Sequence, residues 1–245
     1  MTCMKFSEHQ LEVLNMFMNV NPSIVFKPGQ SVSTISNNKN ILGVCTFKNI
    51  EFERKSPIYD LGNMMKTVRL LSRSSGSSAE VVFTEDRVDI RHGGSTMKYY
   101  YADERMITQP PEKINSIGEP AVITELSHDQ MLQILQTASQ YQLPDLCFQG
   151  KEGHLYAIVT DKRNATSNTL EIDLGETDRD FCFCVKIENI AVVMMGGSAC
   201  KGIKGYKIEL YERKVAKLYG VISETAASTV ENLEFMIALE PDSEY

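Results

Sequence analysis

Residue types that commonly perform catalysis are scattered through this sequence rather than gathered into motifs. The four histidines have no neighbours at the spacing of a metal site or a catalytic triad. Cys182 and Cys184 are two residues apart on an expected strand, but the chain has no Cys-x-x-Cys pair, so we interpret them as buried structural thiols. The glycine-rich run from Gly196 to Gly202 lacks the Gly-Lys-Ser/Thr ending of a phosphate loop and follows an expected helix. We therefore expect no enzyme activity, no metal site and no cofactor.

Basic residues form the pattern that best indicates a ligand. Lys66, Arg69 and Arg73 stand at i, i+3 and i+7 of an expected helix, so they project as one stripe opposite its methionines and leucines. That spacing suits successive phosphates of a duplex backbone, although most such stripes are solvated surface. A second basic pair follows the fourth expected helix, and a weaker candidate precedes the first. The residues expected to face duplex DNA are Lys5, Lys66, Arg69, Arg73, Lys201 and Lys204.

Composition is that of a globular protein with one large domain or two domains of about 120 residues. Of the 245 residues, 42% are hydrophobic and 23% are charged. The net charge of −7 argues against a protein that coats nucleic acid nonspecifically, but allows positive charge confined to one surface. The six irregularly spaced cysteines predict free thiols in a reducing cytosol. The chain lacks an apolar run long enough for a membrane span, so we expect a cytoplasmic location.

The sequence also contains an internal repeat. Phe6–Leu11 (FSEHQL) returns as Leu126–Met131 (LSHDQM), and each run leads into an amphipathic helix and then a proline-led strand. Glu80–Phe83, followed by a charged turn, is matched by Lys207–Leu210. A duplicated scaffold usually builds a surface or a ring rather than a single catalytic cleft. The alternative is chance similarity between two amphipathic helices.

Hydrophobic periodicity predicts that each half runs helix, strands, helix, strands, which is an α+β arrangement with helices on one face of antiparallel sheets. Ser7 and Ser127 are expected N-caps, and Gly196-Gly197 is expected to end the fourth helix. The expected helices are Ser7–Val20, Leu61–Arg73, Ser127–Tyr141 and Ile187–Met195. The expected strands include Ser23–Phe26, Ile41–Phe47, Ala79–Phe83, Thr96–Tyr101, His154–Thr160, Thr169–Leu174, Tyr206–Tyr211, Val215–Ile222 and Leu233–Leu239.

The segment between the halves has no clear period and contains Pro110-Pro111, Gly118 and Pro120. We therefore place domain 1 at residues 1–110, an inter-domain connector at 111–122 and domain 2 at 123–245.

Four further segments stand in order along the chain, namely Phe26–Gln30, Ile58–Leu61, Thr124–Leu135 and Ile237–Ser243. Together, in this collinear order, they resemble the sliding clamp of T-even-type bacteriophages. The resemblance implies duplicated DNA-clamp domains with sheets outside and helices on the inner face. It also implies a closed homotrimeric ring whose twelve helices line a hole around duplex DNA.

A clamp of this kind is a DNA polymerase processivity factor without catalytic activity. Its implied partners are duplex DNA, held nonspecifically and topologically, the replicative polymerase and a clamp loader. A role in late transcription is also implied, as is action in the host-cell cytoplasm. One departure is that the third helix carries glutamines where basic residues are expected. The alternative function is a structural, β-rich phage assembly protein with no DNA-linked behaviour.

The resemblance also implies two protein-binding regions. A partner's hydrophobic tail would enter a groove between the domains, with a lining of Ile41, Ile107, Met236, Leu239 and Pro241; the alternative is that the terminal-strand residues belong to the core. Subunits would join head to tail through edge strands, unless both strands are interior and the protein is a monomer. The expected interface residues are Thr96, Met97, Lys98, Tyr99, Tyr100 and Tyr101 in one strand and Thr169, Leu170, Glu171, Ile172, Asp173 and Leu174 in the other.

Overall fold

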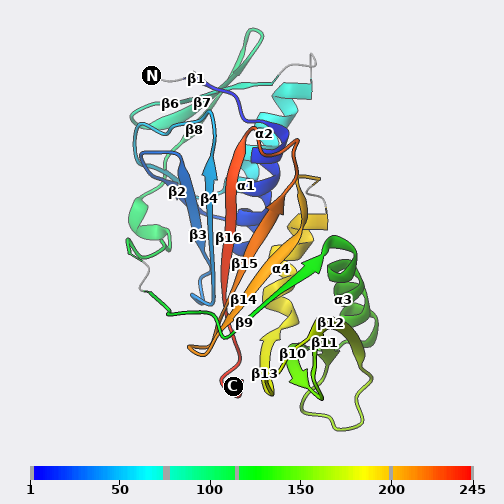
Figure 1. The fold of residues 1–245 in the computed structure, drawn as a ribbon. Helices are drawn as coiled ribbons and strands as arrows, with labels where there is room; N and C mark the ends of the chain where they lie inside the picture. The colour runs from blue at the N-terminus through cyan, green and yellow to red at the C-terminus, as the bar shows by residue number, and fades with distance from the viewer. Residues whose placement is uncertain (1–2, 74–77, 114–115, 199–200, 244–245) are drawn as a thin grey trace.

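The computed structural model describes residues 3–73, 78–113, 116–198 and 201–243, which form an α+β fold of antiparallel sheets with helices on one side (Figure 1). The first half contains β1 (Cys3–Met4), α1 (Glu8–Val20), β2 (Ile24–Phe26), β3 (Ser31–Ile35), β4 (Ile41–Phe47), β5 (Ser56–Ile58), α2 (Leu61–Arg73), β6 (Glu80–Phe83), β7 (Arg87–His92), β8 (Ser95–Tyr100) and the 3-10 helix η1 (Glu104–Met106). The second half contains β9 (Val122–Ser127), α3 (His128–Tyr141), β10 (Asp145–Lys151), β11 (His154–Thr160), β12 (Leu170–Glu176), β13 (Phe181–Lys186), α4 (Ile187–Ser198), β14 (Ile203–Tyr211), β15 (Val215–Ile222) and β16 (Val230–Ala238).

The two halves repeat one element order, which confirms the duplication predicted from the sequence. In each half a strand precedes the first helix, four strands separate the two helices, and three strands follow the second helix. The strand pairs are equivalent as well, because β1 pairs with β6 as β9 pairs with β14. By this order β4 corresponds to β12, and β8 corresponds to β16.

One of the sheets crosses the boundary between the halves. One sheet has the order β1-β6-β7-β8 and another has the order β12-β11-β10-β13. A six-stranded sheet with the order β3-β4-β16-β15-β14-β9 contains strands from both halves (Figure 1). The antiparallel pair of β4 and β16 therefore joins the two halves through backbone hydrogen bonds.

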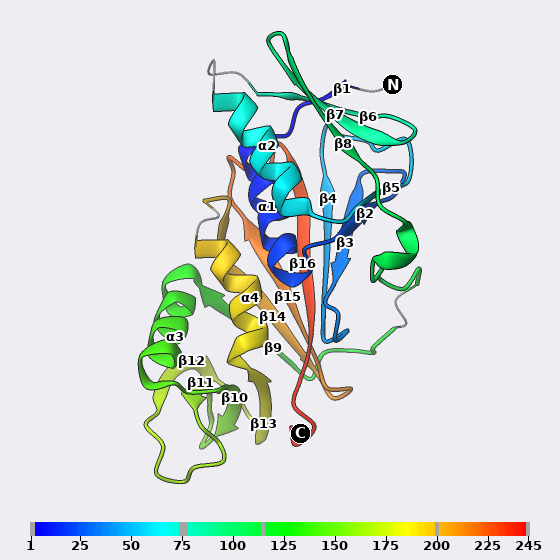
Figure 2. The ribbon, with the colours of Figure 1, turned by 180° about the vertical axis from the view of Figure 1, so that it is seen from behind.

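The helices lie on one side of these sheets. Figure 2, seen from the helix side, shows α1 between α2 and α4, and α1 contacts both. The buried face of α1 includes Leu14 and Phe17, both fully buried, and Phe17 meets Phe235 of β16 edge to face. Within the described residues, no helix is both long and apolar enough to cross a lipid bilayer.

The first helix of each half begins with the same capping box. Ser7 Oγ accepts from the Gln10 backbone N–H, and the Gln10 side chain accepts from the Ser7 N–H. Ser127 and Gln130 repeat both contacts at the start of α3. The predicted N-caps are therefore confirmed, and the reciprocal glutamines satisfy backbone donors that a helix start leaves unpaired.

Two predictions about secondary structure and cysteines are wrong. Gly196-Gly197 lies inside α4, which extends to Ser198, because glycine weakens a helix by about 1 kcal/mol but does not forbid it. Cys147 and Cys184 form a disulfide, where free thiols were predicted. They are 37 residues apart in the chain but stand opposite each other in the register of β10 and β13.

Candidate nucleic-acid interface

Helix α2 positions the basic stripe. Its buried face holds Met64, Met65 and Val68, which turns Lys66 and Arg69 away from the core. Lys66 is exposed and Arg69 is half-buried, and neither has an ion-pair partner within the described residues. Their charges are therefore available to an external anion. Arg73 is the last residue of α2, but its side chain lies outside the described residues.

The start of α2 is tied to strand β8. Asp60 Oδ1 accepts from the Asn63 N–H at 2.8 Å, which caps the helix. The Asp60 backbone N–H donates to Tyr99 Oη at 3.0 Å, and this hydroxyl donates to the Asp60 carbonyl at 3.1 Å. Burial raises the pKa of the Tyr99 hydroxyl, so it remains a hydrogen-bond donor at neutral pH. The stripe therefore stands on a helix whose first turn is fixed.

The remaining predicted DNA-facing residues lie at the ends of neighbouring elements. Lys201 lies in the turn after α4 and Lys204 lies in β14, and both are exposed. Lys5 follows β1 and is exposed, but its Nζ lies 3.5 Å from a carboxylate oxygen of Glu80. That ion pair offsets part of its charge, so Lys5 is the least available of the described candidates.

The polar side chains of α1 and α3 differ in their exposure. Glu12 is only 9% exposed, and its carboxylate lies 3.0 Å from His9 Nδ1. Helix α1 packs against both α2 and α4, so most of its residues are buried. In α3, by contrast, Gln133 and Gln140 are exposed as expected. Neither α1 nor α3 contains a lysine or arginine, so the described basic candidates on the helices are those of α2.

The residues predicted to line the partner groove divide into two groups. Ile41, Ile107 and Leu239 are buried, whereas Met236 is half-buried and Pro241 is exposed. Ile41 and Leu239 belong to the region where β4 meets the end of β16, since Ile41 stands opposite Ile237.

Sequence reasoning missed Leu42 and Val44, which lie on the outer face of the joint between β4 and β16. Met236 stands opposite Leu42 in the register, and Val44 shares the face of Leu42 because strand side chains alternate. All three are half-buried. Burial alternates along Ile41–Phe47 in the structure, but the run is almost wholly apolar, so the sequence holds no alternation that would separate this face from the core.

The two predicted interface strands are outer strands of their sheets. β8 and β12 each have one hydrogen-bonded neighbour in the described structure. Most of β8 is exposed, including Met97 at 50% and Tyr100 at 62%, but Tyr99 is anchored at α2 and Tyr101 donates to the Thr84 carbonyl. In β12, Leu170, Ile172 and Leu174 are half-buried and pack against the core.

Comparison with known proteins gives a consistent result, although no protein-family model matches the chain. The chain is 26% identical to the sliding clamp of Vibrio phage KVP40, over 97% of this chain and 99% of that protein. It is 24% identical to the sliding clamp of Enterobacteria phage T4, with 98% of each chain covered. The resemblance to clamps of T-even-type phages predicted from the sequence is thereby confirmed, and the names agree with the prediction of a non-enzymatic protein.

Solved structures show the same fold. The A. fulgidus PCNA, in a complex described as the C-terminal region of FEN-1 bound to it, superposes with a TM-score of 0.71 at 13% identity, covering 100% of both chains. The proliferating cellular nuclear antigen from Entamoeba histolytica gives a TM-score of 0.70 at 14% identity, covering 97% of this chain and 98% of that one. The predicted fold of duplicated clamp domains is confirmed.

Proposed function

We propose that this chain is a sliding clamp, a homotrimeric ring that encircles duplex DNA and tethers a replicative DNA polymerase. The relatives with that name match it over nearly their whole length. The observation that carries the proposal is the joint between β4 and β16 inside the chain.

The internal joint indicates how subunits would meet. By the duplication, β12 is equivalent to β4 and β8 is equivalent to β16. The strands equivalent to the paired β4 and β16 are therefore β12 and β8, and each of them is an outer strand of its sheet. If β8 of one subunit pairs with β12 of the next, the joint inside the chain is repeated between chains. Such an interface is head to tail and closes into a ring when the rotation per subunit divides a full turn.

The side chains at the two edges fit this arrangement. Leu170, Ile172 and Leu174 leave apolar area half-covered on the face that packs against the core, and Met97 is half-exposed. Pairing would cover these side chains and satisfy the backbone groups of two unpaired edges. Tyr99 is already anchored to α2, so β8 would bring its helix into a fixed position relative to the neighbour.

Binding to DNA would be weak, nonspecific and topological. The chain has a net charge of −7, so only a local positive surface can approach a polyanion. Lys66, Arg69 and Arg73 of α2, with Lys201 and Lys204, are the proposed contacts to phosphate, and Lys5 is secondary. Phosphate contacts carry no base information, which allows a ring to slide.

We also propose that partner proteins bind the outer face of the β4·β16 joint. Met236, Leu42 and Val44 provide adjacent half-buried apolar surface, and Pro241 is exposed beside the end of β16. A short hydrophobic segment of a polymerase or clamp loader fits such a surface. This apolar surface would be supported from the interior by the buried residues Ile41, Ile107 and Leu239. Late transcription factors are further proposed partners, and the site of action would be the host-cell cytoplasm.

We propose that the chain has two domains, which the connector links in sequence and the β4·β16 pair joins in space. Domain 1 comprises residues 1–110, the connector 111–122 and domain 2 123–245. Arg213 donates to the Ser116 carbonyl and the Ala121 N–H donates to the Leu210 carbonyl, so the end of the connector is held against the β14–β15 hairpin.

The decisive experiment loads the protein onto nicked circular DNA with its cognate loader and then cuts the circle. A clamp remains on the intact circle at moderate salt and leaves through the ends once the DNA is linear. It also increases the length of products made by its polymerase. Loss of equal amounts from circular and linear DNA would contradict the proposal and favour a structural protein.

A further inference from the structure

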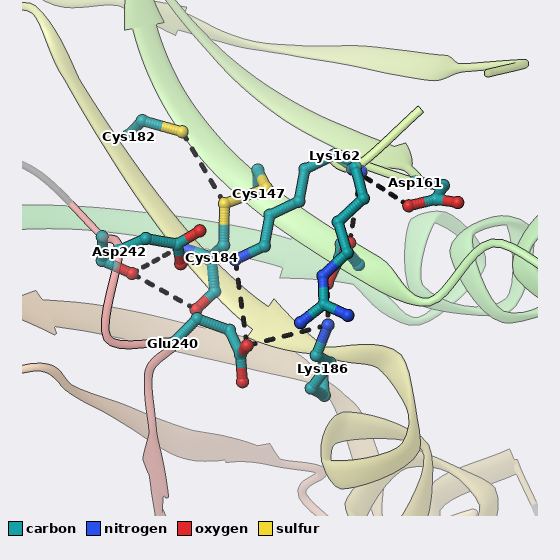
Figure 3. Close-up of a disulfide and its surroundings, with 11 residues drawn as sticks. Cys147, Asp161, Lys162, Cys182, Cys184, Lys186, Glu240 and Asp242 are labelled. Atoms are coloured by element: carbon teal, nitrogen blue, oxygen red, sulfur yellow. Dashed lines mark hydrogen bonds and ion pairs between the residues drawn. A yellow bond between two sulfur atoms is a disulfide. The ribbon is translucent and has the colours of Figure 1, made fainter. Parts of the chain in front are cut away.

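Three cysteine sulfurs converge on the outer face of the sheet that contains β10 and β13 (Figure 3). Cys147 and Cys184 stand opposite each other and form the disulfide, and Cys182 lies two residues before Cys184 on the same face. Cys182 Sγ lies 3.7 Å from Cys184 Sγ, and all three sulfurs lie within 4.8 Å of one another.

The sulfurs form a compact triangle rather than a line. Attack of a thiolate on a disulfide proceeds in line, which would separate the two outer sulfurs by roughly 6 Å, given a sulfur–sulfur bond of about 2.05 Å. In the structure no two of the three sulfurs are more than 4.8 Å apart, which is shorter than the separation that in-line attack requires. The arrangement therefore suits three donors around one centre better than exchange between Cys182 and the disulfide.

We propose that, once the disulfide is reduced, Cys147, Cys182 and Cys184 bind one thiophilic divalent cation of the Zn²⁺ class. A tetrahedral Zn²⁺ with bonds of about 2.3 Å separates its sulfur ligands by about 3.75 Å. Cys182 and Cys184 already have that separation at 3.7 Å. Cys147 needs only to move away from Cys184 after their bond breaks, from the facing position on β10.

The chemistry requires a two-electron reductant, which we take to be a dithiol. The dithiol is oxidised to its own disulfide, the Cys147–Cys184 bond is broken, and each sulfur receives one electron and one proton. Cation binding then displaces the three thiol protons to solvent. The disulfide and the cation are alternative occupants of one site, so each state excludes the other.

The surroundings provide access and favourable charge. Cys147 and Cys184 are about 5% and 4% exposed, whereas Cys182 is half-buried and borders an open hollow that Glu152 and Asp180 also line. This hollow gives an entry path and room for water as a fourth ligand.

A cation with three thiolates has a net charge of −1, which a nearby positive side chain stabilises. Lys186 follows Cys184 at the next position on the same face of β13. Its Nζ donates to Asp145 Oδ1 at 2.6 Å, which holds the ammonium on the face that carries the three cysteines.

The same strand holds the C-terminal segment. The Cys184 N–H donates to Ser243 Oγ at 3.0 Å, and the Glu240 N–H donates to the Cys184 carbonyl at 2.8 Å. Figure 3 shows Glu240 and Asp242 in the C-terminal segment that runs past Cys184. A cation at this site would therefore fix the strand on which residues 240–243 rest, and it should raise the thermal midpoint of the reduced protein.

The test uses the full-length protein, reduced with a phosphine under argon and titrated with Cd²⁺, whose thiolate complexes absorb in the ultraviolet. We expect one Cd²⁺ per chain with the absorption of three thiolate bonds, and displacement by Zn²⁺. The protein with its disulfide intact should bind none at this site. Cys182→Ser, which leaves the disulfide partners in place, should lower the affinity by at least about tenfold, which corresponds to 1.4 kcal/mol.

Cys3→Ser is the matched control, because Cys3 is exposed and lies in β1 of a different sheet. It should bind Cd²⁺ like the unchanged protein. Far-ultraviolet circular dichroism of each reduced variant verifies that the fold persists. The proposal is overturned if the reduced protein binds no stoichiometric Cd²⁺, or if Cys182→Ser binds it as tightly as the Cys3→Ser control.

Discussion

Ile41 of β4 lies directly opposite Ile237 of β16, and this pair belongs to the joint that makes the two halves one sheet. The joint is close, because a Cβ added at Gly43 would lie 2.9 Å from a ring carbon of Phe235 and 3.0 Å from one of Phe17. Although β4 and β16 are far apart in the sequence, they therefore pack as closely as the residues of a hydrophobic core. The equivalent strands β12 and β8 have no such partner within the described chain.

The first prediction concerns this unpaired edge. Ile172→Glu places a charge among the half-buried side chains of β12 that would be covered by the neighbouring subunit. Burying an unpaired carboxylate is costly, so we expect the trimer to dissociate to monomers at micromolar concentration. Sedimentation velocity measures the change directly. The monomer should keep its circular dichroism spectrum, since Ile172 is only half-buried in the isolated chain.

Val221→Glu is the matched control for that substitution. Val221 is 42% exposed and lies in β15, which has neighbours on both sides in the six-stranded sheet. The variant should remain a trimer. If Ile172→Glu stays trimeric under the same conditions, the interface is not at β12.

The sequence predicted the fold well where a pattern was local. The bounds of α2 follow from its methionine and leucine periodicity, and the bounds of β4, β11 and β15 follow from β-type runs bounded by turn residues. Strands with few apolar residues, such as β3 and β7, were not predicted, because pairing with their neighbours stabilises them more than their own composition does.

Long-range relationships explain what the sequence could not reveal about the site. The burial of Glu12 depends on the tertiary packing around α1, and no pattern within α1 indicates it. The Cys147–Cys184 bond depends on the register of β10 and β13, across 37 residues. The basic stripe on α2 was predictable because its spacing within one helix fixes its direction.

The second prediction tests the basic stripe. Replacing Lys66, Arg69 and Arg73 together with alanine should weaken loading and long-product synthesis while leaving the oligomer intact. For every phosphate that the variant no longer binds, the slope of log affinity against log salt should fall by about one. The measurement is synthesis on primed circular DNA over a range of salt concentrations. An unchanged product length at moderate salt would show that the stripe is only solvated surface.

A control triple variant removes the same charge elsewhere. Lys27, Arg105 and Lys151 lie outside the helical elements that carry the stripe, in a loop, η1 and β10 respectively. Their replacement with alanine changes net charge equally, so it separates a local contact from general electrostatics. Synthesis by this variant should resemble that of the unchanged clamp.

The third prediction compares the two capping glutamines. Gln10 is 1% exposed, and its Nε2 also donates to the carbonyls of Lys48 and Thr229, at 3.0 and 3.1 Å, in opposite halves of the chain. Gln10→Ala removes this donor from two half-buried carbonyls, of which that of Thr229 still accepts from the Lys48 N–H, and should lower the free energy of unfolding by about 2–4 kcal/mol. Gln130→Ala removes only the side-chain acceptor of the Ser127 N–H, because the Gln130 backbone N–H still donates to Ser127 Oγ, and it should cost about 1 kcal/mol or less. Urea denaturation distinguishes them, and equal losses would contradict the bridging role of Gln10.

The fourth prediction concerns acid stability. Asp89 is 3% exposed, and a hydrogen bond from Arg91 at 2.7 Å, with a second from Arg87 at 2.8 Å, lowers the pKa of its carboxyl despite burial. A lowered folded-state pKa contributes stability that is present above the unfolded pKa of about 3.9 and is lost as pH falls through the folded value. Asp89→Asn should therefore destabilise the protein by about 1–3 kcal/mol at pH 7, and the difference should shrink below pH 4. Asp86→Asn removes a 59% exposed partner of the same Arg87 and should change little at any pH. Thermal midpoints measured from pH 3 to pH 7 test both variants, and a difference for Asp89→Asn that persists unchanged at pH 3 would contradict the role assigned to its charge.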